Sequence, residues 1–312
     1  MTVSVCTLAH GRDDHLRNLV RGLSASTRAP DELVIAVMQD ESYDLPSTDF
    51  PVRQIVMGSR DFSLAKARNT AAFAAESEFL VLLDVDCIPS PTLIADYLAV
   101  AASYDGVFMG EVGYLPQGAT RAGIDFENFE TVSVKHSERA GPPAGPVGPC
   151  RDYRCFWSLN FALRAETFAN IGGFDTDYEG YGGEDTDFAR MVVSAGMPLW
   201  WVKGAKAFHQ QHAHHMPPVH HLDSVLANVA VFQRKWGEPT MQHWLRAFTL
   251  MGLVERSGEG WRKLREPGEA ELALTRQQEN APYASSSDVL EWLEEREAER
   301  SANREAPSIA AE

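Results

Sequence analysis

The chain has 312 residues, of which 44% are apolar and 23% are charged, an ordinary composition for a globular protein with a sizeable core. Acidic residues outnumber basic ones 44 to 28, which gives a formal net charge of −16. This balance argues against nucleic acid or an anionic membrane as the main partner, because both reward a basic surface.

The first residues predict a strand and not a targeting segment. Residues 1–5 lack a basic stretch followed by an apolar core, and no apolar run approaches the roughly 20 residues that span a bilayer. The four cysteines have no framework or zinc-finger spacing, so free thiols are expected. Together these features predict a cytoplasmic protein with no membrane span.

The first half of the sequence alternates strand and helix patterns. Short apolar runs predict strands at residues 3–7, 33–37, 52–56 and 79–83, and helical spacing predicts helices at 16–23 and 63–75. Repeated strand–helix units of this kind predict an α/β fold with a mainly parallel sheet flanked by helices. In such sheets, ligands bind beyond the carboxyl ends of the strands.

The second half divides into a continuation of this domain and a helical appendage. A Pro- and Gly-rich stretch at 137–154 is typical of a mobile loop, and a helix is expected to begin near Glu184. We expect one α/β domain over residues 1–221, a helical region over 222–296 and a flexible, highly charged tail over 297–312.

Asp84 and Asp86 follow directly after the strand predicted at 79–83. Two carboxylates one residue apart in a turn can both reach one hard cation, which then bridges diphosphate oxygens. A capped turn is the alternative interpretation of such a triplet. The buried strand before it and the tight exit at Pro89 favour metal binding.

Three acidic residues, Glu184, Asp185 and Asp187, stand at a predicted helix start behind a glycine pair and Tyr181. Capping and the helix dipole explain one or two of these acids. A general base for a sugar hydroxyl needs a carboxylate held rigidly beside the reaction centre, and an exposed aromatic suits stacking against a sugar ring. The pattern leaves capping and catalysis open, and one residue can serve both.

Six histidines fall within residues 209–221. His209 and His212 have a spacing that closes on a metal already held by carboxylates, and a mixed site of this kind favours Mn²⁺ over Mg²⁺, although Mg²⁺ stays possible. His214 remains an alternative ligand. A polar loop is the interpretation without function.

These segments resemble a known family. Residues 82–89 (LLDVDCIP) are similar to the DxD segment of glycosyltransferases with the GT-A fold. Residues 171–175 (IGGFD) and 181–187 (YGGEDTD) resemble the GGF…WGGEDDD region of the β-1,4-galactosyltransferases and their bacterial relatives. Residues 67–69 (ARN) resemble a segment of family 2 glycosyltransferases. The resemblance covers roughly residues 2–215.

The resemblance implies a role for each matching residue. Asp86 would ligate the metal together with His209 and His212, which have the spacing of the family's M-x-x-H pair. Asp185 would be the base that deprotonates the acceptor hydroxyl, and Glu184 would hold the acceptor. The nucleotide-sugar would contact Thr7, Ala9, Arg12, Asp40, Arg68, Asp84 and Tyr181.

The family therefore implies an inverting, metal-dependent enzyme that moves a hexose from a UDP-sugar (UDP-galactose, UDP-glucose or an N-acetylated analogue) to the hydroxyl of a glycan, a peptide or a small molecule. Two other classes stay open, a non-catalytic nucleotide-sugar or carbohydrate-binding protein and a sugar nucleotidyltransferase. The latter needs a Gly-rich phosphate loop after the first strand, which residues 8–13 do not provide. The sequence does not indicate an oligomeric state.

Overall fold

The computed structural model describes residues 1–59, 62–136, 139, 142–258, 260–276 and 286–305. Within it the chain forms two compact units, Met1–His212 and Ala213–Glu312. The domain boundary expected at residue 221 and the tail expected from residue 297 stay predictions. The last part of that tail, residues 306–312, lies outside the described residues.

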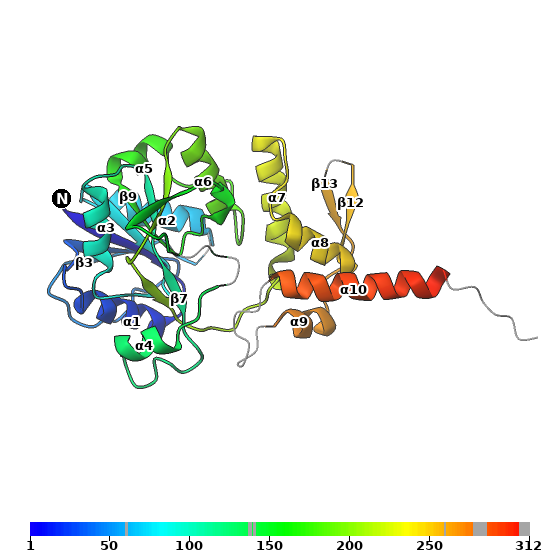
Figure 1. The fold of residues 1–312 in the computed structure, drawn as a ribbon, viewed down its shortest axis with the longest axis horizontal. Coiled ribbons are helices and arrows are strands. Elements are labelled where there is room, and N and C mark those ends of the chain that lie inside the picture. Colours follow the sequence, from blue (N-terminus) through cyan, green and yellow to red (C-terminus); the bar gives the residue numbers. More distant parts are fainter. Residues whose placement is uncertain (60–61, 137–138, 140–141, 259, 277–285, 306–312) are drawn as a thin grey trace, which may run out of the picture. The chain divides into compact units, whose positions relative to one another are not determined.

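The larger unit is built on a central sheet flanked by helices (Figure 1). The order of its strands is β3-β2-β1-β4-β9-β6-β10-β8. Its strands are β1 (Val3–Ala9), β2 (Glu32–Val37), β3 (Val52–Val56), β4 (Phe79–Leu83), β6 (Val107–Met109), β8 (Val147–Cys150), β9 (Asn160–Arg164) and β10 (Leu199–Val202). The neighbours β3, β2, β1 and β4 are parallel, as are β6 and β10, whereas β9 is antiparallel to β4 and β6. The predicted α/β fold with a mainly parallel sheet is confirmed.

Helices cover both faces of this sheet. α1 (Asp13–Ser24) and α3 (Leu93–Ala101) pack on one face, and α2 (Leu64–Ala74), α5 (Ala165–Ile171) and α6 (Glu184–Ser194) pack on the other. The strands and helices expected in the first half are confirmed, as is the helix expected to begin at Glu184. Completely buried residues such as Leu33, Val81 and Phe188 explain why apolar periodicity was sufficient to find these elements.

The prediction of a loop at 137–154 is partly wrong, because this stretch contains β8 and the start of a 3₁₀ helix, η1 (Tyr153–Cys155). β8 pairs antiparallel with β10 although it includes Pro149. It lies at the edge of the sheet, where a proline costs no ladder hydrogen bond on the open side. Residues 137–138 and 140–141 of the expected loop lie outside the described residues.

A second, three-stranded sheet positions two of the candidate metal ligands described below. β11 (Ala207–His209) lies between β5 (Cys87–Pro89) and β7 (Val112–Tyr114), antiparallel to the first and parallel to the second. The register places His209 opposite both Cys87 and Tyr114. Helix α4 (Phe126–Val132) covers this sheet through a small aromatic cluster.

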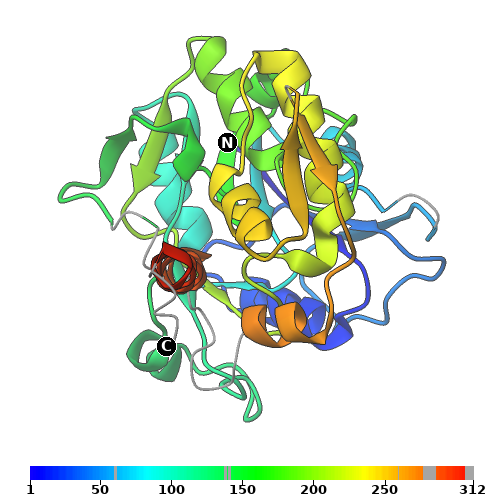
Figure 2. The ribbon, with the colours of Figure 1, turned by 90° about the vertical axis from the view of Figure 1, so that its right-hand side faces the viewer.

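The smaller unit contains η2 (Val219–His221), α7 (Leu222–Trp236), α8 (Gln242–Leu250), α9 (Glu269–Thr275) and α10 (Ser286–Glu305). The expectation of a purely helical region missed a hairpin of β12 (Val254–Ser257) and β13 (Gly260–Lys263), drawn as two orange arrows in Figure 2. Gly258 has a φ of +60°, so it permits the chain reversal that helical periodicity does not reveal.

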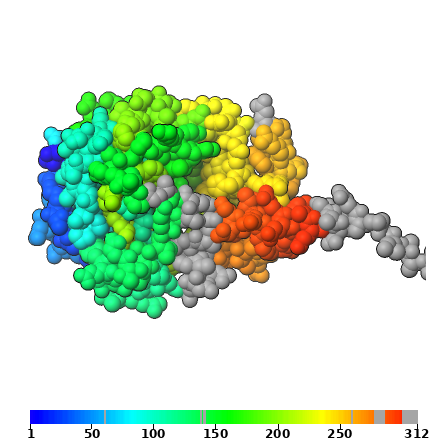
Figure 3. All heavy atoms as spheres, viewed as in Figure 1, coloured from blue at the N-terminus to red at the C-terminus, as the bar shows by residue number. Residues whose placement is uncertain are grey.

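The described part of α10 is mostly exposed on the face shown in Figure 3. Its side chains carry a dense mixture of acidic and basic groups, including an ion pair between Arg246 of α8 and Glu294 (3.1 Å). None of the helices among the described residues combines the length and the apolar character needed to cross a bilayer.

Asn69 ties α2 to the glycine turn that follows α5. Its Nδ2 donates to the carbonyl oxygen of Phe174 (2.7 Å), and its Oδ1 accepts from the Phe174 N–H (2.8 Å). Gly172 and Gly173 both have positive φ values, of +91° and +73°, so the chain can turn sharply enough to present this backbone to Asn69.

We expect Gly173→Ala to destabilise the protein more than Gly172→Ala. Each substitution forces alanine into the left-handed region, at a cost of about 1–2 kcal/mol. A Cβ on Gly173 would additionally lie 2.5 Å from Asn69 Oδ1, whereas one on Gly172 meets no atom within 4 Å. Denaturant unfolding of the two variants measures the difference. Equal losses would mean that the Asn69 contact adds no constraint.

Candidate functional site

The first part of the site is the turn that joins β4 to β5. The Asp84 N–H donates to the carbonyl of Leu159 in the segment before β9 (3.0 Å), and the Cys87 N–H donates to the carbonyl of Asp84 (2.9 Å). These bonds close the turn directly at the carboxyl end of β4. The structure therefore places Asp84 and Asp86 where the strand pattern predicts a ligand-binding edge.

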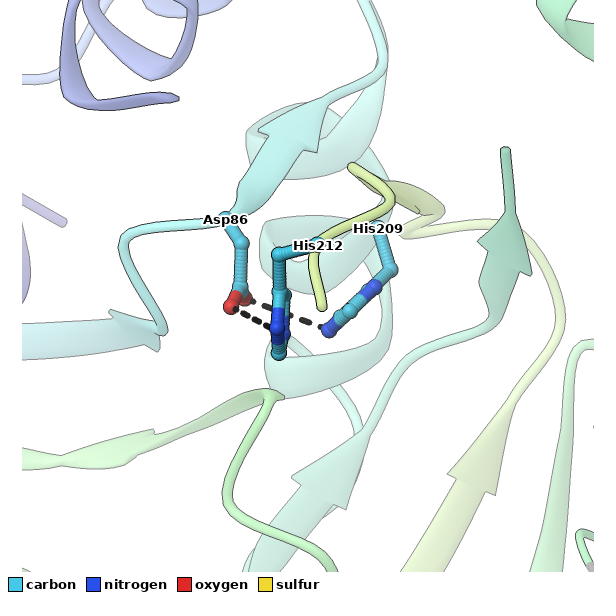
Figure 4. Close-up of side chains that lie close together, drawn as sticks. All are labelled: Asp86, His209 and His212. Carbon is cyan, nitrogen blue, oxygen red and sulfur yellow. Dashed lines mark ion pairs between the residues drawn. The ribbon is translucent and has the colours of Figure 1, made fainter. Parts of the chain in front are cut away.

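Asp86 is brought together with His209 and His212, two of the histidines singled out from the sequence. Nε2 of His209 lies 3.5 Å from Asp86 Oδ1, and Nε2 of His212 lies 3.4 Å from Asp86 Oδ2 (Figure 4). The pairing of β11 with β5 puts His209 beside the turn, and the Gln210 N–H donates to the Asp86 carbonyl (2.7 Å). One ligand atom from each of the three residues lies within 4.8 Å of the other two.

This donor set fits a divalent cation. A carboxylate and two imidazoles suit Mn²⁺ better than Mg²⁺, which prefers an all-oxygen shell. Although burial alone would raise the pKa of Asp86, the neighbouring His209, His212 and Arg12 hold it well below its usual value. The lowered pKa keeps Asp86 ionised among the candidate metal ligands.

Arg12 lies at this cluster. Its Nη1 binds Asp86 Oδ2, and its Nη2 lies 3.4 Å from His212 Nδ1. The backbone of Arg12 is left-handed (φ 55°) at the start of α1, which turns the residue back toward the end of β4. The structure associates Arg12 with the candidate metal ligands, while its role toward a nucleotide stays a prediction.

Arg68 joins the two acidic motifs. Only 5% of its side chain is exposed; Nη2 donates to Asp84 Oδ1 and Nη1 donates to Glu184 Oε1, both at 3.0 Å. Arg68 belongs to α2. Through Arg68 this helix therefore binds two carboxylates, Asp84 and Glu184, that are far apart in the sequence. Burial, together with the charge of Asp86, raises the pKa of Asp84 in spite of Arg68.

Asp185 stands in the first turn of α6, next to Glu184. The N-cap of this helix is Gly183, which has no side chain to cap with, and Asp185 Oδ1 accepts from the N–H of Thr186 (2.7 Å). Burial raises the pKa of Asp185 to about 7, and the negative charge of Glu184 adds to this effect. Capping alone does not explain a carboxyl group adjusted to neutral pH.

Tyr181 and Asp187 flank this acid pair. Burial raises the pKa of Tyr181, as do the charges of Glu184 and Asp185. Asp187 is completely buried, so it belongs to the packing of α6. Glu179 is an exposed carboxylate in the segment before the helix.

Thr7 lies at the acidic site, within β1. It is 2% exposed and lines a narrow crevice together with Arg68, Asp84 and Ser158. Its hydroxyl oxygen is buried with no hydrogen-bond partner among the described residues.

Ala9 and Asp40 are placed differently. Ala9 is buried at the end of β1, where its carbonyl accepts from the Met38 N–H (2.9 Å). Asp40 is exposed and accepts from the N–H of Ser59 (3.0 Å), which follows β3. The structure therefore gives Asp40 a turn-stabilising contact, and nucleotide binding by these two residues stays a prediction.

Sequence reasoning missed two supporting residues. Gln210 fixes the segment between the candidate ligands, because its Oε1 accepts from Asn18 Nδ2 (2.8 Å) and its Nε2 donates to the His15 carbonyl (3.1 Å), both in α1. The Tyr114 ring lies 4.9 Å from the His209 ring. Gln210 had a visible signal, since it stands inside the H-Q-Q-H segment, but Tyr114 had none.

A protein-family model described as the N-terminal domain of galactosyltransferase matches residues 144–215. A validoxylamine A glucosyltransferase of Streptomyces hygroscopicus subsp. limoneus is 25% identical over 226 residues, which cover 63% of this chain and 49% of that protein. A chondroitin synthase of Escherichia coli is 23% identical over 172 residues, covering 48% and 25%.

Among solved structures, S. aureus TarS 1-349 in complex with UDP-GlcNAc has a TM-score of 0.49 and 15% identity, covering 68% of this chain and 59% of its own. The chain spans about half the length of the two validoxylamine A glucosyltransferases that it matches. The resemblance to glycosyltransferases that the motifs indicate is confirmed by the family model and these relatives.

We expect Asp86→Asn to weaken Mn²⁺ binding by at least about tenfold, because the substitution removes the only negatively charged ligand of the described cluster. Electron paramagnetic resonance titration of Mn²⁺, with UDP present, measures the affinity. His214→Ala is the control. Because His214 lies outside the described cluster, the Mn²⁺ affinity of this variant should equal that of wild type. Loss of affinity in His214→Ala, with Asp86→Asn unaffected, would move the site elsewhere.

Proposed function

We propose that this chain is an inverting, metal-dependent glycosyltransferase that moves a hexose from a UDP-sugar to an acceptor hydroxyl. The observation that carries the proposal is the double ion pair of Arg68 with Asp84 and Glu184. It holds the turn that bears the candidate metal ligand Asp86 next to the helix start that bears the candidate base Asp185. A non-catalytic binding protein needs no such coupling.

We assign binding of the UDP-sugar diphosphate to the cluster of Asp86, His209 and His212 at the end of β4. Mn²⁺, or Mg²⁺ in its place, would be held by Asp86, His209 and His212 and would offset the negative charge that develops on the departing diphosphate. The mixed donor set supports this assignment. Arg12, which already contacts Asp86, is suited to hold a phosphate oxygen at the same end of the sheet.

The acceptor side falls to Asp185. Its carboxylate takes the proton of the acceptor hydroxyl as the hydroxyl oxygen forms a bond to the anomeric carbon of the donor. The bond from that carbon to the diphosphate oxygen breaks on the opposite face, so configuration inverts in one displacement. A base with a pKa of about 7 combines a usable deprotonated fraction with sufficient proton affinity at neutral pH.

The remaining predicted residues support these two. Arg68 donates one hydrogen bond to Glu184 and one to Asp84. We therefore assign Arg68 and Glu184 the role of positioning the two acidic motifs relative to each other. Tyr181 is assigned to stacking on a sugar ring next to the acid pair. The acceptor is proposed to be a glycan, a peptide or a small molecule, and the similarity to a protein named as a validoxylamine A glucosyltransferase supports the last. We propose a cytoplasmic location.

A UDP-release assay tests the proposed reaction. We expect UDP to appear when the protein is incubated with UDP-glucose or UDP-galactose, Mn²⁺ and a panel of glycan, peptide and small-molecule acceptors. Excess chelator should abolish the release, because the site holds its cation through only three described side chains. UDP binding without release for every donor and acceptor would favour a non-catalytic binding protein, and full turnover in chelator would contradict the metal dependence.

Asp185→Asn tests the base. The amide cannot take a proton, so turnover should fall by roughly 10²–10⁴-fold, the usual contribution of a general base. UDP and Mn²⁺ affinity should persist, and Glu179→Gln should behave as wild type. Turnover of the wild type should rise with pH through about 7, because the raised pKa leaves Asp185 protonated and inactive below it. A pH-independent rate from 5 to 8, or near-normal turnover of Asp185→Asn, would remove the assignment.

A further inference from the structure

Arg139 is a buried cation that the proposed mechanism does not use. Its side chain lies between two indole rings, with the guanidinium carbon 5.8 Å from the centre of the Trp157 ring and 5.3 Å from that of Trp201. Only 5% of the residue is exposed. Its Nη2 donates to the carbonyl of Gly110 (3.1 Å), directly after β6.

The charge of Arg139 is not balanced by a carboxylate among the residues that the structure describes. Nη1 is buried and has no hydrogen-bond partner in that part of the chain. Burial lowers the pKa of the guanidinium. The groups that oppose this shift are phenols and thiols, with Tyr114 and Tyr97 contributing most. Cation–π contacts offset only part of the cost of removing a full charge from water. A buried, unpaired donor of this kind calls for an anionic partner.

A short series of rings connects Arg139 to the candidate metal cluster. The Trp157 ring lies 4.9 Å from that of His136, and the His136 ring lies 5.6 Å from that of Tyr114. The Tyr114 ring in turn lies 4.9 Å from the His209 ring. Trp157 also precedes Ser158, which lines the crevice shared with Asp84. Arg139 is thus linked to the candidate metal cluster through three successive ring contacts.

We infer that Arg139, Trp157 and Trp201 form a subsite for an anionic substituent of a substrate, a carboxylate or a phosphate. Two oxygens of such a group match the planar fork of a guanidinium, and a flat indole face beside it suits the apolar face of a sugar ring. The inference rests on the proposed function, since the anion belongs either to the donor diphosphate or to an acid group on the acceptor.

The test is Arg139→Met, which removes the charge and keeps an unbranched side chain between the indoles. Without ligand, this variant should melt at a higher temperature than wild type, because an unpaired buried charge is lost. A merely structural arginine would give the opposite result. Arg139→Lys should keep part of the anion binding, because it retains the charge without the fork. Arg154→Met, at an exposed arginine paired with Asp152, is the control and should leave anion binding unchanged.

Three probes identify the source of the anion: inorganic phosphate, glucuronate, and UDP with Mn²⁺, each titrated against the full chain and followed by affinity and thermal shift. A tenfold or larger loss for UDP alone assigns the subsite to the donor diphosphate. The same loss for phosphate or glucuronate, with UDP unaffected, assigns it to an acidic acceptor. Equal affinities of Arg139→Met and wild type for all three probes, or no binding of any probe by wild type, overturn the inference. These binding measurements are separate from UDP release, so a failure of the proposed reaction is recognised independently.

Discussion

The geometry of the candidate site depends on one buried guanidinium. Arg68 donates to Asp84 after β4 and to Glu184 at the start of α6, and its side chain is almost completely enclosed. Breaking one of these bonds would leave a buried charge with one partner fewer, which is strongly destabilising. The next residue, Asn69, holds the glycine turn before α6 through two backbone hydrogen bonds. One turn of α2 therefore holds a carboxylate of each acidic motif through Arg68 and the backbone of the glycine turn through Asn69.

Unequal compensation of the acidic groups gives them different properties. Asp86 has His209, His212 and Arg12 around it, which keeps its pKa well below the usual value in spite of burial. Asp185 is buried beside the negative charge of Glu184, and these two effects outweigh the positive charge of Arg68, so its pKa rises to about 7. Two carboxylates of similar intrinsic acidity thus have pKa values shifted in opposite directions, which suits the roles of metal ligand and general base proposed for them.

The same electrostatic argument applies to the cations. Arg68 is buried between two carboxylates, whereas Arg139 is buried between two indole rings. A native fold retains an uncompensated charge only where the rest of the structure tolerates the cost, and such positions cluster at functional sites. Among the described residues Arg68 has two carboxylate partners and Arg139 has none, and this difference is the basis for the anion subsite proposed at Arg139.

The sequence by itself determined the strands and helices of the first half, the placement of Asp84 and Asp86 at a strand end, and that of Glu184 and Asp185 at a helix start. Apolar periodicity and glycine turns act over a few residues, so they are visible without a fold. It also indicated the pairing of His209 with His212, which are three residues apart. Only the tertiary structure decided that Arg68 bridges Asp84 and Glu184, that Arg12 contacts Asp86, that β8 forms around Pro149, and that Arg139 lies between Trp157 and Trp201. Contacts of this kind depend on which strands become neighbours in the sheet, and local composition does not encode that order.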